Sequence, residues 1–336
     1  MILFRADGGP GIGSGHLMRC LALAQALRDR GEAVGLATVS PDLPAVNEWR
    51  GEGAAIIPVG APRGSRKDGE IALASARHLK ARAMVADGYA FDPGYIATLK
   101  TSGLPLMQYD DLGLTATVAD WVVNQNPGAE TCSYPAGTTV LRGLRYLALR
   151  RALRALTKRA RPVGVIPRLL VTFGGDDEDN LALAAMKALR DLPVPFVADV
   201  IVTAGPAGLA TVRDAAAAVR DRFRVSGPTD IVPLMATADL GLCAGGSTSL
   251  ELCALGVPMV IVSTADNQIG AAFLEKVGVA RFAGNGKATM ARAIATVGEL
   301  LADPEQCRTM GSQGRALIDG CGVDRLARLL LEGCEE

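Results

Sequence analysis

The sequence predicts an α/β protein of two Rossmann-like, doubly wound domains with a central cleft. Short apolar runs alternate with longer helical patterns, which is typical of βαβ units around a parallel sheet. The alternation occurs twice, on either side of a basic and proline-containing break at residues 158–167. The length of 336 residues, 49% of them apolar, also suits two hydrophobic cores better than one.

The first half begins with a buried strand that runs into a glycine-rich turn. Its short runs of Val, Ile, Leu, Met and Ala are typical of strands buried on both faces, and the longer apolar-polar patterns between them predict helices. We predict strands at residues 1–4, 33–38, 54–59, 83–86, 106–109 and 121–123, and helices at 17–30 and 71–80. These elements form the predicted N-terminal domain, residues 1–160.

The second half repeats this rhythm and forms the predicted C-terminal domain, residues 165–336. We predict strands at residues 168–173, 196–202, 240–243 and 258–262, and helices at 180–189, 209–219, 248–255, 288–302 and 323–331. The last helix is expected to pack back on the N-terminal domain. In doubly wound sheets, ligands bind where the carboxyl ends of strands meet helix amino termini, so we expect the functional residues in those loops.

The composition argues against several classes of partner. Lysine and arginine number 35, as do aspartate and glutamate, and aromatic residues are only 4%, so nucleic acid is not expected as a partner. No segment approaches the roughly 18 apolar residues of a membrane span. The seven cysteines are dispersed without a Cys-x-x-Cys pair, as in reduced proteins. We expect a cytoplasmic monomer without an integral membrane segment. The eight basic residues within 142–161 are interpreted as a solvated face and hinge, with a patch for anionic membrane as the alternative.

The first candidate site is the Gly-Ile-Gly-Ser-Gly-His turn at residues 11–16, between the opening strand and its helix. Gly13 and Gly15 permit close approach of a ligand, and the helix amino terminus favours anionic groups. His16 opens the helix, whose positive end should keep the imidazole neutral, as a general base requires. The alternative is a histidine that only caps the turn. The second histidine, His78, lies in a helical pattern, and we expect neither a metal nor a cofactor.

The second candidate site follows the strand at 240–243. Its glycine turn and the start of the next helix offer backbone N–H groups and hydroxyls to a diphosphate. The residues are Gly245, Gly246, Ser247 and Thr248. Glu251, one turn into the helix, can accept hydrogen bonds from a ribose diol; the alternative is a capping box with Thr248. Asn267 and Gln268 end the next strand and would lie at the same sheet edge.

Polar residues also follow other predicted strands. Gly174 ends the strand at 168–173 and could supply a backbone donor to a phosphate or sugar. In the first half, Asp87, Tyr89, residues 110–111 (Asp-Asp) and residues 124–126 (Asn-Gln-Asn) could line a sugar pocket. A glycosidase pair formed by Asp87 and Asp111 is a less favoured interpretation.

Together these motifs resemble a known family along nearly the whole chain. The chain resembles the nucleotide-sugar hydrolases of pseudaminic acid synthesis, which cleave UDP-2,4-diacetamido-2,4,6-trideoxy-β-L-altropyranose. They are relatives of the UDP-GlcNAc transferase of peptidoglycan synthesis and share its GT-B fold. The motifs that carry the resemblance are Arg5-Ala6-Asp7, Gly13-x-Gly15-His16-x-Met18-Arg19-Cys20, Asp87-x-Tyr89, Asp110-Asp111, Asn124-Gln125-Asn126, Gly143-x-x-Tyr146, Phe173-Gly174-Gly175, Gly245-Gly246-Ser247-Thr248 with Glu251, and Asp266-Asn267-Gln268.

The resemblance implies roles for individual residues. His16 would be the base, Asn267 would lie in the active site and Tyr89 near the sugar, while Glu251 would bind ribose and the backbone at 229–232, including Ile231, would pair with uracil. The other residues expected to bind substrate are Gly13, Gly15, Arg19, Asp87, Gly174, Gly245, Gly246, Ser247, Thr248 and Gln268. The chain departs from the family at 8–10 (Gly-Gly-Pro) and 176–178 (Asp-Asp-Glu), which alters the loops expected around the cleft.

The favoured mechanism is metal-independent hydrolysis, in which His16 takes a proton from water that attacks C1 of the sugar as UDP leaves. The first alternative is a UDP-sugar glycosyltransferase on the same fold, which passes the sugar to an acceptor. The second is a non-catalytic nucleotide-sugar sensor, which would not need His16. A dependence of the product on an added acceptor separates the first two.

Overall fold

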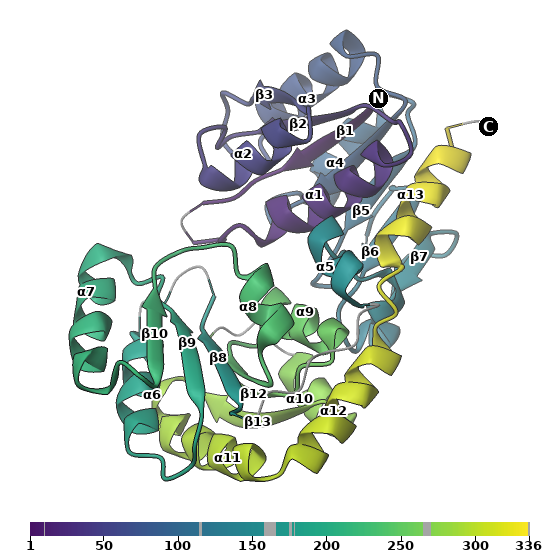
Figure 1. Cartoon of the computed structure of the whole chain (residues 1–336). Coiled ribbons are helices and arrows are strands. Elements are labelled where there is room, and N and C mark those ends of the chain that lie inside the picture. Colours follow the sequence, from purple (N-terminus) through teal and green to yellow (C-terminus); the bar gives the residue numbers. More distant parts are fainter. Residues whose placement is uncertain are drawn as a thin grey trace. The chain divides into compact units, whose positions relative to one another are not determined.

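The computed structural model describes residues 1–9, 11–113, 116–157, 166–174, 177, 179–264 and 270–334. The chain forms two compact units, unit 1 with Met1–Arg151 and Gly320–Glu336, and unit 2 with Ala152–Asp319 (Figure 1). Each unit contains one parallel sheet with helices packed on it, and each is described below by itself.

The sheet of unit 1 has seven strands in the order β3-β2-β1-β4-β5-β6-β7, and its described pairings are all parallel. The strands are β1 (Ile2–Ala6), β2 (Val34–Thr38), β3 (Ala55–Pro58), β4 (Ala83–Asp87), β5 (Leu106–Tyr109), β6 (Trp121–Asn124) and β7 (Thr139–Arg142). Every residue of β1, β2 and β4 is buried, because helices cover both faces of the sheet centre. The order reverses between β1 and β4, which makes their carboxyl ends the switch point of this sheet.

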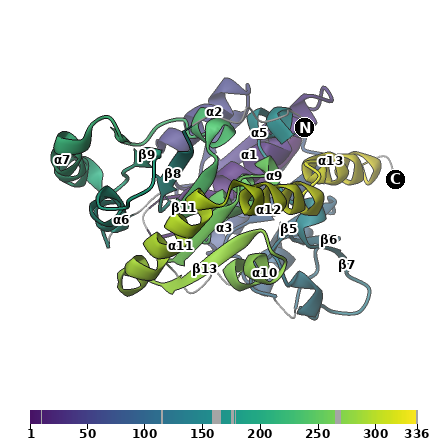
Figure 2. The same cartoon turned by 60° about the horizontal axis from the view of Figure 1, so that its bottom comes forward.

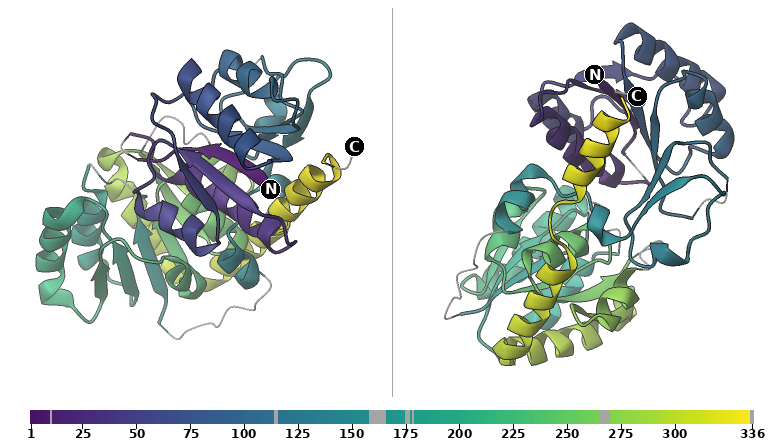
Figure 3. Two further views of the ribbon diagram at one scale, coloured as in Figure 1. Left: turned by 90° about the horizontal axis from the view of Figure 1, so that it is seen from above. Right: turned by 90° about the vertical axis from the view of Figure 1, so that its right-hand side faces the viewer.

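Unit 1 contains helices from both ends of the chain. They are α1 (Gly15–Arg28), α2 (Pro44–Gly51), α3 (Arg66–His78), α4 (Pro93–Lys100) and α13 (Gly322–Glu332), while α5 (Arg151–Thr157) starts where the division into units falls. Two short 3-10 turns, Ala129–Thr131 and Leu144–Tyr146, flank β7. The last helix, α13, packs against α1 (Figure 3). It buries Val323, Leu326, Ala327 and Leu330, which share one helix face.

The sheet of unit 2 has six strands in the order β10-β9-β8-β11-β12-β13, again parallel in every described pairing. The strands are β8 (Arg168–Thr172), β9 (Val197–Ile201), β10 (Phe223–Ser226), β11 (Leu240–Cys243), β12 (Met259–Ser263) and β13 (Ala280–Asn285). The helices are α6 (Leu181–Arg190), α7 (Gly205–Ala216), α8 (Val232–Thr237), α9 (Ser247–Leu255), α10 (Gly270–Lys276), α11 (Met290–Ala302) and α12 (Pro304–Leu317). The 3-10 turns are Ala217–Val219 and Lys287–Thr289. The switch point lies between β8 and β11.

Helix α12 approaches α9 closely within unit 2 (Figure 2). A Cβ atom added to Gly311 of α12 would lie 2.4 Å from the carbonyl oxygen of Gly256, which ends α9, and one on Gly314 would lie 2.7 Å from the carbonyl oxygen of Cys253. Glycine at these helix positions lets the two backbones touch. The contact fixes α9, which carries the second candidate site.

The α/β, doubly wound fold class is confirmed, and each strand predicted from the sequence is present within a few residues of its predicted ends. The sequence analysis did not predict α2, α4, α5, α8, α10 or α12, nor β7, β10 and β13. Part of the basic stretch is used internally, since Arg151 forms ion pairs with Asp29 and Glu52. No helix in the described part of the chain is long and apolar enough to cross a membrane.

Candidate active site

The switch point of the unit 1 sheet brings together two polar side chains from distant parts of the sequence. His16 is the second residue of α1, the helix that follows β1, and Asp87 is the last residue of β4. Ala6 and Asp87 are register partners on the adjacent strands β1 and β4. The topology therefore places the start of α1 beside the end of β4.

The glycine turn positions His16. Gly9 and Gly13 exchange two backbone hydrogen bonds of 2.9 Å, and Gly11 and Gly13 have φ of +78° and +65°, which disfavour residues with a Cβ atom. Ser14 caps α1 without a side-chain hydrogen bond, and the first turn contains no acidic residue. The turn thus reverses the chain tightly and starts α1 with its amino-terminal N–H groups unoccupied by side chains at the cap.

His16 and Asp87 form a buried histidine–carboxylate pair. The distance from His16 Nδ1 to Asp87 Oδ1 is 2.6 Å, and the two residues are 5% and 0% exposed. When Nδ1–H donates to the carboxylate, Nε2 holds the lone pair and can accept a proton. The ring of Tyr89 stands edge-on to the imidazole, with centroids 4.6 Å apart, and limits its rotation. From the sequence, we predicted that the positive end of the helix keeps the imidazole neutral. The structure adds the Asp87 carboxylate, which orients the ring.

Arg19 holds Asp87 in place from one turn further along α1. Its Nε and Nη2 lie 2.5 and 2.6 Å from the two Asp87 oxygens. Burial alone would raise the pKa of Asp87, but the charges of Arg19 and His16 and their hydrogen bonds outweigh it and hold this pKa well below its usual range. A fully buried carboxylate that stays ionised cannot serve as a general acid, so Asp87 does not fit the acid's role in the glycosidase interpretation.

Asp111 extends this network to the ends of β5 and β6. Its Oδ1 accepts hydrogen bonds of 2.7 Å from Arg19 Nη1 and from Asn126 Nδ2, and its Oδ2 accepts a 3.4 Å hydrogen bond from the Tyr89 hydroxyl. We predicted Asp111 and Asn126 as residues that could line a sugar pocket, and Asp111 also as half of the less favoured glycosidase pair. Sequence reasoning could not connect them to Arg19, because ion-pair partners 92 positions apart leave no local pattern.

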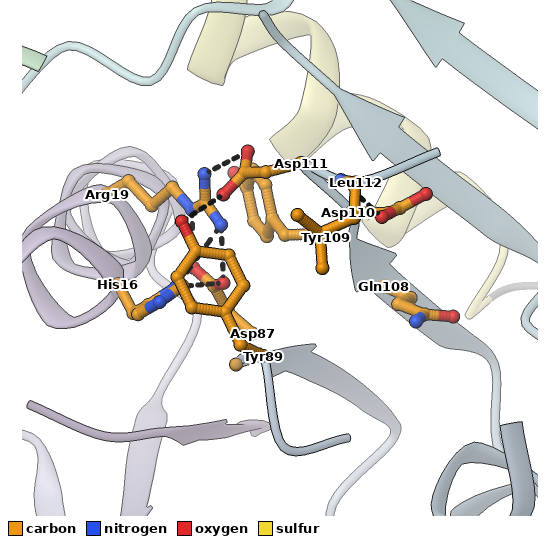
Figure 4. Close-up of a pocket in the computed structure, with 10 residues that line it drawn as sticks. His16, Arg19, Asp87, Tyr89, Gln108, Tyr109, Asp110, Asp111 and Leu112 are labelled. Atoms are coloured by element: carbon orange, nitrogen blue, oxygen red, sulfur yellow. Dashed lines mark hydrogen bonds and ion pairs between the residues drawn. The ribbon is translucent and has the colours of Figure 1, made fainter. Parts of the chain in front are cut away.

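These side chains surround a small pocket in unit 1 (Figure 4). The pocket has a volume of about 20 Å³, which admits a group of the size of a water molecule or a hydroxyl. Figure 4 shows Arg19 between Asp87 and Asp111, with the Tyr89 ring facing His16. The lining residues are His16, Arg19, Asp87, Gly88, Tyr89, Gln108, Tyr109, Asp110, Asp111 and Leu112.

The second candidate site occupies the switch point of the unit 2 sheet. Thr172 of β8 and Cys243 of β11 are register partners, so the turns containing Gly174 and Gly245 leave neighbouring strand ends. Gly174 has φ of +92°, and its carbonyl oxygen accepts a hydrogen bond from the Thr203 hydroxyl.

Helix α9 begins at Ser247, with Gly246 as its cap residue. Gly246 has no side chain, and Thr248 lies inside the helix, so Thr248 is not the cap residue that the alternative of a capping box requires. The N–H groups of the first turn point along the helix axis, a geometry that binds phosphate. Gly245, Gly246, Thr248 and Glu251 are partly exposed and Ser247 is exposed.

Of the three remaining predicted site residues, the structure describes one. Ile231 caps the six-residue helix α8 and is partly exposed. Asn267 and Gln268, predicted as catalytic and substrate-binding residues, lie outside the described residues. Among the described side chains, no group of three or more His, Cys, Asp or Glu residues could hold a metal ion.

The chain is similar to UDP-sugar enzymes in sequence and in structure. A UDP-N-acetylglucosamine–N-acetylmuramyl-(pentapeptide) pyrophosphoryl-undecaprenol N-acetylglucosamine transferase of Hahella chejuensis is 26% identical over 359 residues, covering 97% of this chain and 96% of the transferase. The crystal structure of Acinetobacter baumannii MurG superposes with a TM-score of 0.70 at 18% identity, over 98% and 99% of the two chains. A UDP-GlcNAc 2-epimerase of Neisseria meningitidis bound to UDP-GlcNAc gives 0.67 at 12% identity, over 99% and 100%. No protein-family model matches the chain.

These comparisons confirm the GT-B fold and correct the predicted reaction. The curated relatives that align with nearly the whole chain are N-acetylglucosamine transferases, so the prediction of a UDP-sugar hydrolase of pseudaminic acid synthesis is wrong. The error has a physical reason. The motifs behind the prediction concern the loops expected to bind the donor and the expected base, and they do not encode whether water or an acceptor hydroxyl receives the sugar.

Proposed function

We propose that this chain, which has the GT-B fold and aligns along almost its whole length with N-acetylglucosamine transferases, transfers the sugar of a UDP-sugar to an acceptor hydroxyl. The observation that carries the proposal is the His16–Asp87 pair at the switch point of the unit 1 sheet. A group-transfer enzyme needs a base for the attacking hydroxyl, and a histidine oriented by a buried carboxylate suits that task.

His16 acts as the general base in this proposal. The acceptor O–H gives its proton to Nε2 of His16, the oxygen forms a bond to C1 of the sugar, and the bond from C1 to the phosphate oxygen breaks with its electron pair on UDP. Asp87 stabilises the imidazolium that results, because Arg19 keeps it ionised. A positioned base of this kind contributes about 10²–10⁴-fold to the rate.

Unit 2 holds the UDP part of the donor in this proposal. The amino terminus of α9, at Ser247, supplies N–H groups and a positive dipole end to the diphosphate, and these also stabilise the charge that develops as UDP leaves. Glu251, in the second turn of α9, accepts hydrogen bonds from the ribose. All seven cysteines are free thiols, which fits a reaction in the reducing cytoplasm.

The experiment combines UDP-N-acetylglucosamine with a set of acceptors, including the lipid-linked acceptor named for the relatives and neutral alkyl glycosides. UDP release is followed in ¹⁸O-water, and the sugar product is identified by mass spectrometry. We expect UDP release to depend on an acceptor and the product to be a glycoside without ¹⁸O. Equal UDP release without an acceptor, or tight UDP-sugar binding with no release under any condition, would refute the proposal.

Variants assign the roles of the two units. His16→Asn should lower turnover by about 10²–10⁴-fold while leaving UDP binding intact, measured by calorimetry. The matched control is His78→Asn, which changes the other histidine, an exposed residue of α3, and should leave turnover unchanged. Glu251→Ala should weaken UDP binding by about tenfold or more, the value of a hydrogen bond to a charged group. Unchanged UDP affinity would remove Glu251 from the site.

A further inference from the structure

One carboxylate oxygen in the pocket of unit 1, Asp111 Oδ2, is held only weakly by its neighbours in the described part of the chain. Asp111 Oδ1 is saturated by Arg19 and Asn126 at 2.7 Å each. Among the residues that the structure describes, Asp111 Oδ2 accepts a hydrogen bond from Tyr89 alone, and its 3.4 Å length exceeds the 2.5–3.0 Å that is usual for O–H···O. The side chain is 14% exposed and lines the pocket, so Oδ2 can accept a second, shorter hydrogen bond from a ligand.

The charges around the pocket have one sign in excess. The lining residues include the carboxylates of Asp87, Asp110 and Asp111 against the single guanidinium of Arg19. Three carboxylates against one guanidinium give the lining side chains an excess of negative charge. Asp110 is 4% exposed and its Oδ1 accepts hydrogen bonds from the N–H groups of Leu112 and Gly113, which fixes its charge beside the pocket. A hydrogen-bond donor or a cation is therefore favoured there and an anion is disfavoured.

The rim of the pocket is apolar and exposed. Tyr89 is 46% exposed and Leu112 is 60% exposed, and both line the pocket together with Asp111 (Figure 4). The pocket itself admits one hydroxyl-sized group, so the body of a ligand would lie on this rim. An aromatic face and an aliphatic side chain suit the C–H face of a sugar ring.

We propose that Asp111 binds the acceptor by accepting a hydrogen bond through Oδ2 from a hydroxyl or ammonium group, and that this pocket rejects anionic groups. The inference rests on the proposed function in one respect, that the ligand of this pocket is the acceptor. It identifies the acceptor class as a neutral or amino-bearing sugar at the ring that enters the pocket. A phosphate or carboxylate must lie elsewhere on the acceptor.

The test measures binding and does not depend on transfer. The probes are three methyl glucosides that differ only at C6: the 6-amino-6-deoxy compound, the parent alcohol and the glucuronide. The chain has two histidines, so a His78→Asn background leaves His16 as the one imidazole, and its Cε1–H NMR signal reports binding at this pocket. We expect the amino glucoside to bind at least about tenfold more tightly than the glucuronide, since the excess charge acts over a few ångströms.

The variant Asp111→Asn keeps the shape and removes one negative charge. It should weaken binding of the amino glucoside and bring the ratio between amino glucoside and glucuronide to below about threefold. The matched control is Asp120→Asn, which removes a carboxylate that holds Lys100 and the N–H of Leu106 before β6, away from the pocket. This control should leave the ratio unchanged.

Each outcome decides the inference separately from the proposed function. Equal binding of the three glucosides to the unsubstituted Asp111 protein, or no response of the His16 signal up to their solubility limits, would overturn the role of Asp111 even if transfer occurs. An unchanged ratio in Asp111→Asn would do the same. A clear preference for the amino glucoside in a protein that transfers no sugar would instead leave the binding site standing and refute the transferase proposal.

Discussion

Replacing Asp87 by Asn tests the centre of the unit 1 network. The side chain is 0% exposed and meets four donors, two of them on Arg19 at 2.5 and 2.6 Å, one on His16 at 2.6 Å and the Cys20 thiol at 3.5 Å. Arg19 is only 12% exposed, so the substitution leaves a buried guanidinium with Asp111 as its remaining carboxylate. Breaking a buried ion pair from one side costs about 3–5 kcal/mol. Asn retains one acceptor, so we expect a loss near the lower limit, about 3 kcal/mol.

Tryptophan fluorescence can isolate this effect. The two tryptophans, Trp49 and Trp121, both belong to unit 1, and Trp49 is fully buried against Phe4. Urea unfolding followed by their emission therefore reports the stability of unit 1. The control is Glu70→Gln, which breaks an exposed pair with Arg66 and should cost less than about 1 kcal/mol. A loss for Asp87→Asn no larger than that of the control would refute the buried network.

Three further predictions concern acid stability, packing and thiol reactivity. Because the pKa of Asp87 is lower in the folded protein than the usual value of about 3.9, its contribution to stability is present above that pH and is lost as the pH falls below it; Asp87→Asn should flatten this part of the pH dependence of unit 1 unfolding. Gly311→Ala places a Cβ atom 2.4 Å from the carbonyl oxygen of Gly256 and should destabilise unit 2 by about 1–3 kcal/mol, visible by calorimetry as a lower transition for the unit without tryptophan; an unchanged transition would show that the two helices separate easily. Burial raises the pKa of Cys243 and Cys253 to about 12, so iodoacetamide at pH 8 should modify them only after denaturation, as mass spectrometry of digests can establish.

The sequence predicts the central strands well because their signal is local. β5 and β11 begin and end where the apolar runs at 106–109 and 240–243 do, and the turn at 11–16 predicts the start of α1. The elements that were missed have weak local signals. β7 and β10 contain arginine and have partly exposed residues, and α12 contains glycines at 311 and 314 that lower its helix propensity. The close contact with α9 stabilises α12, and the sequence of α12 alone does not reveal that contact.

The candidate site is predictable residue by residue, but its connections are not. His16, Asp87 and Tyr89 each follow a strand or a glycine turn, which is a local pattern. That Asp87 meets both His16 and Arg19 depends on β1 and β4 being neighbours at the switch point of the sheet, which requires the strand order. The role of Asp111 depends in addition on β5 lying next to β4. Whether water or an acceptor receives the sugar is even harder to predict from a local motif, because it depends on which groups the folded pocket admits.

The order of charges in the network explains why it suits a base. Asp111, Arg19, Asp87 and His16 form a row in which negative and positive groups alternate, and the row ends at the imidazole. In the proposed reaction, a proton that reaches Nε2 of His16 puts a positive charge beside Asp87, whose Oδ1 lies 2.6 Å from Nδ1. Arg19 Nη2 also lies 3.3 Å from Nδ1, so the guanidinium and the imidazole share the carboxylate. Without Arg19, Asp87 and Asp111 would repel each other, and burial would favour the protonated form of Asp87. A protonated Asp87 would no longer offer a negative charge to His16. In the proposed reaction Arg19 is therefore a positioning residue that touches no reacting atom, and its guanidinium binds two of the carboxylates that line the pocket.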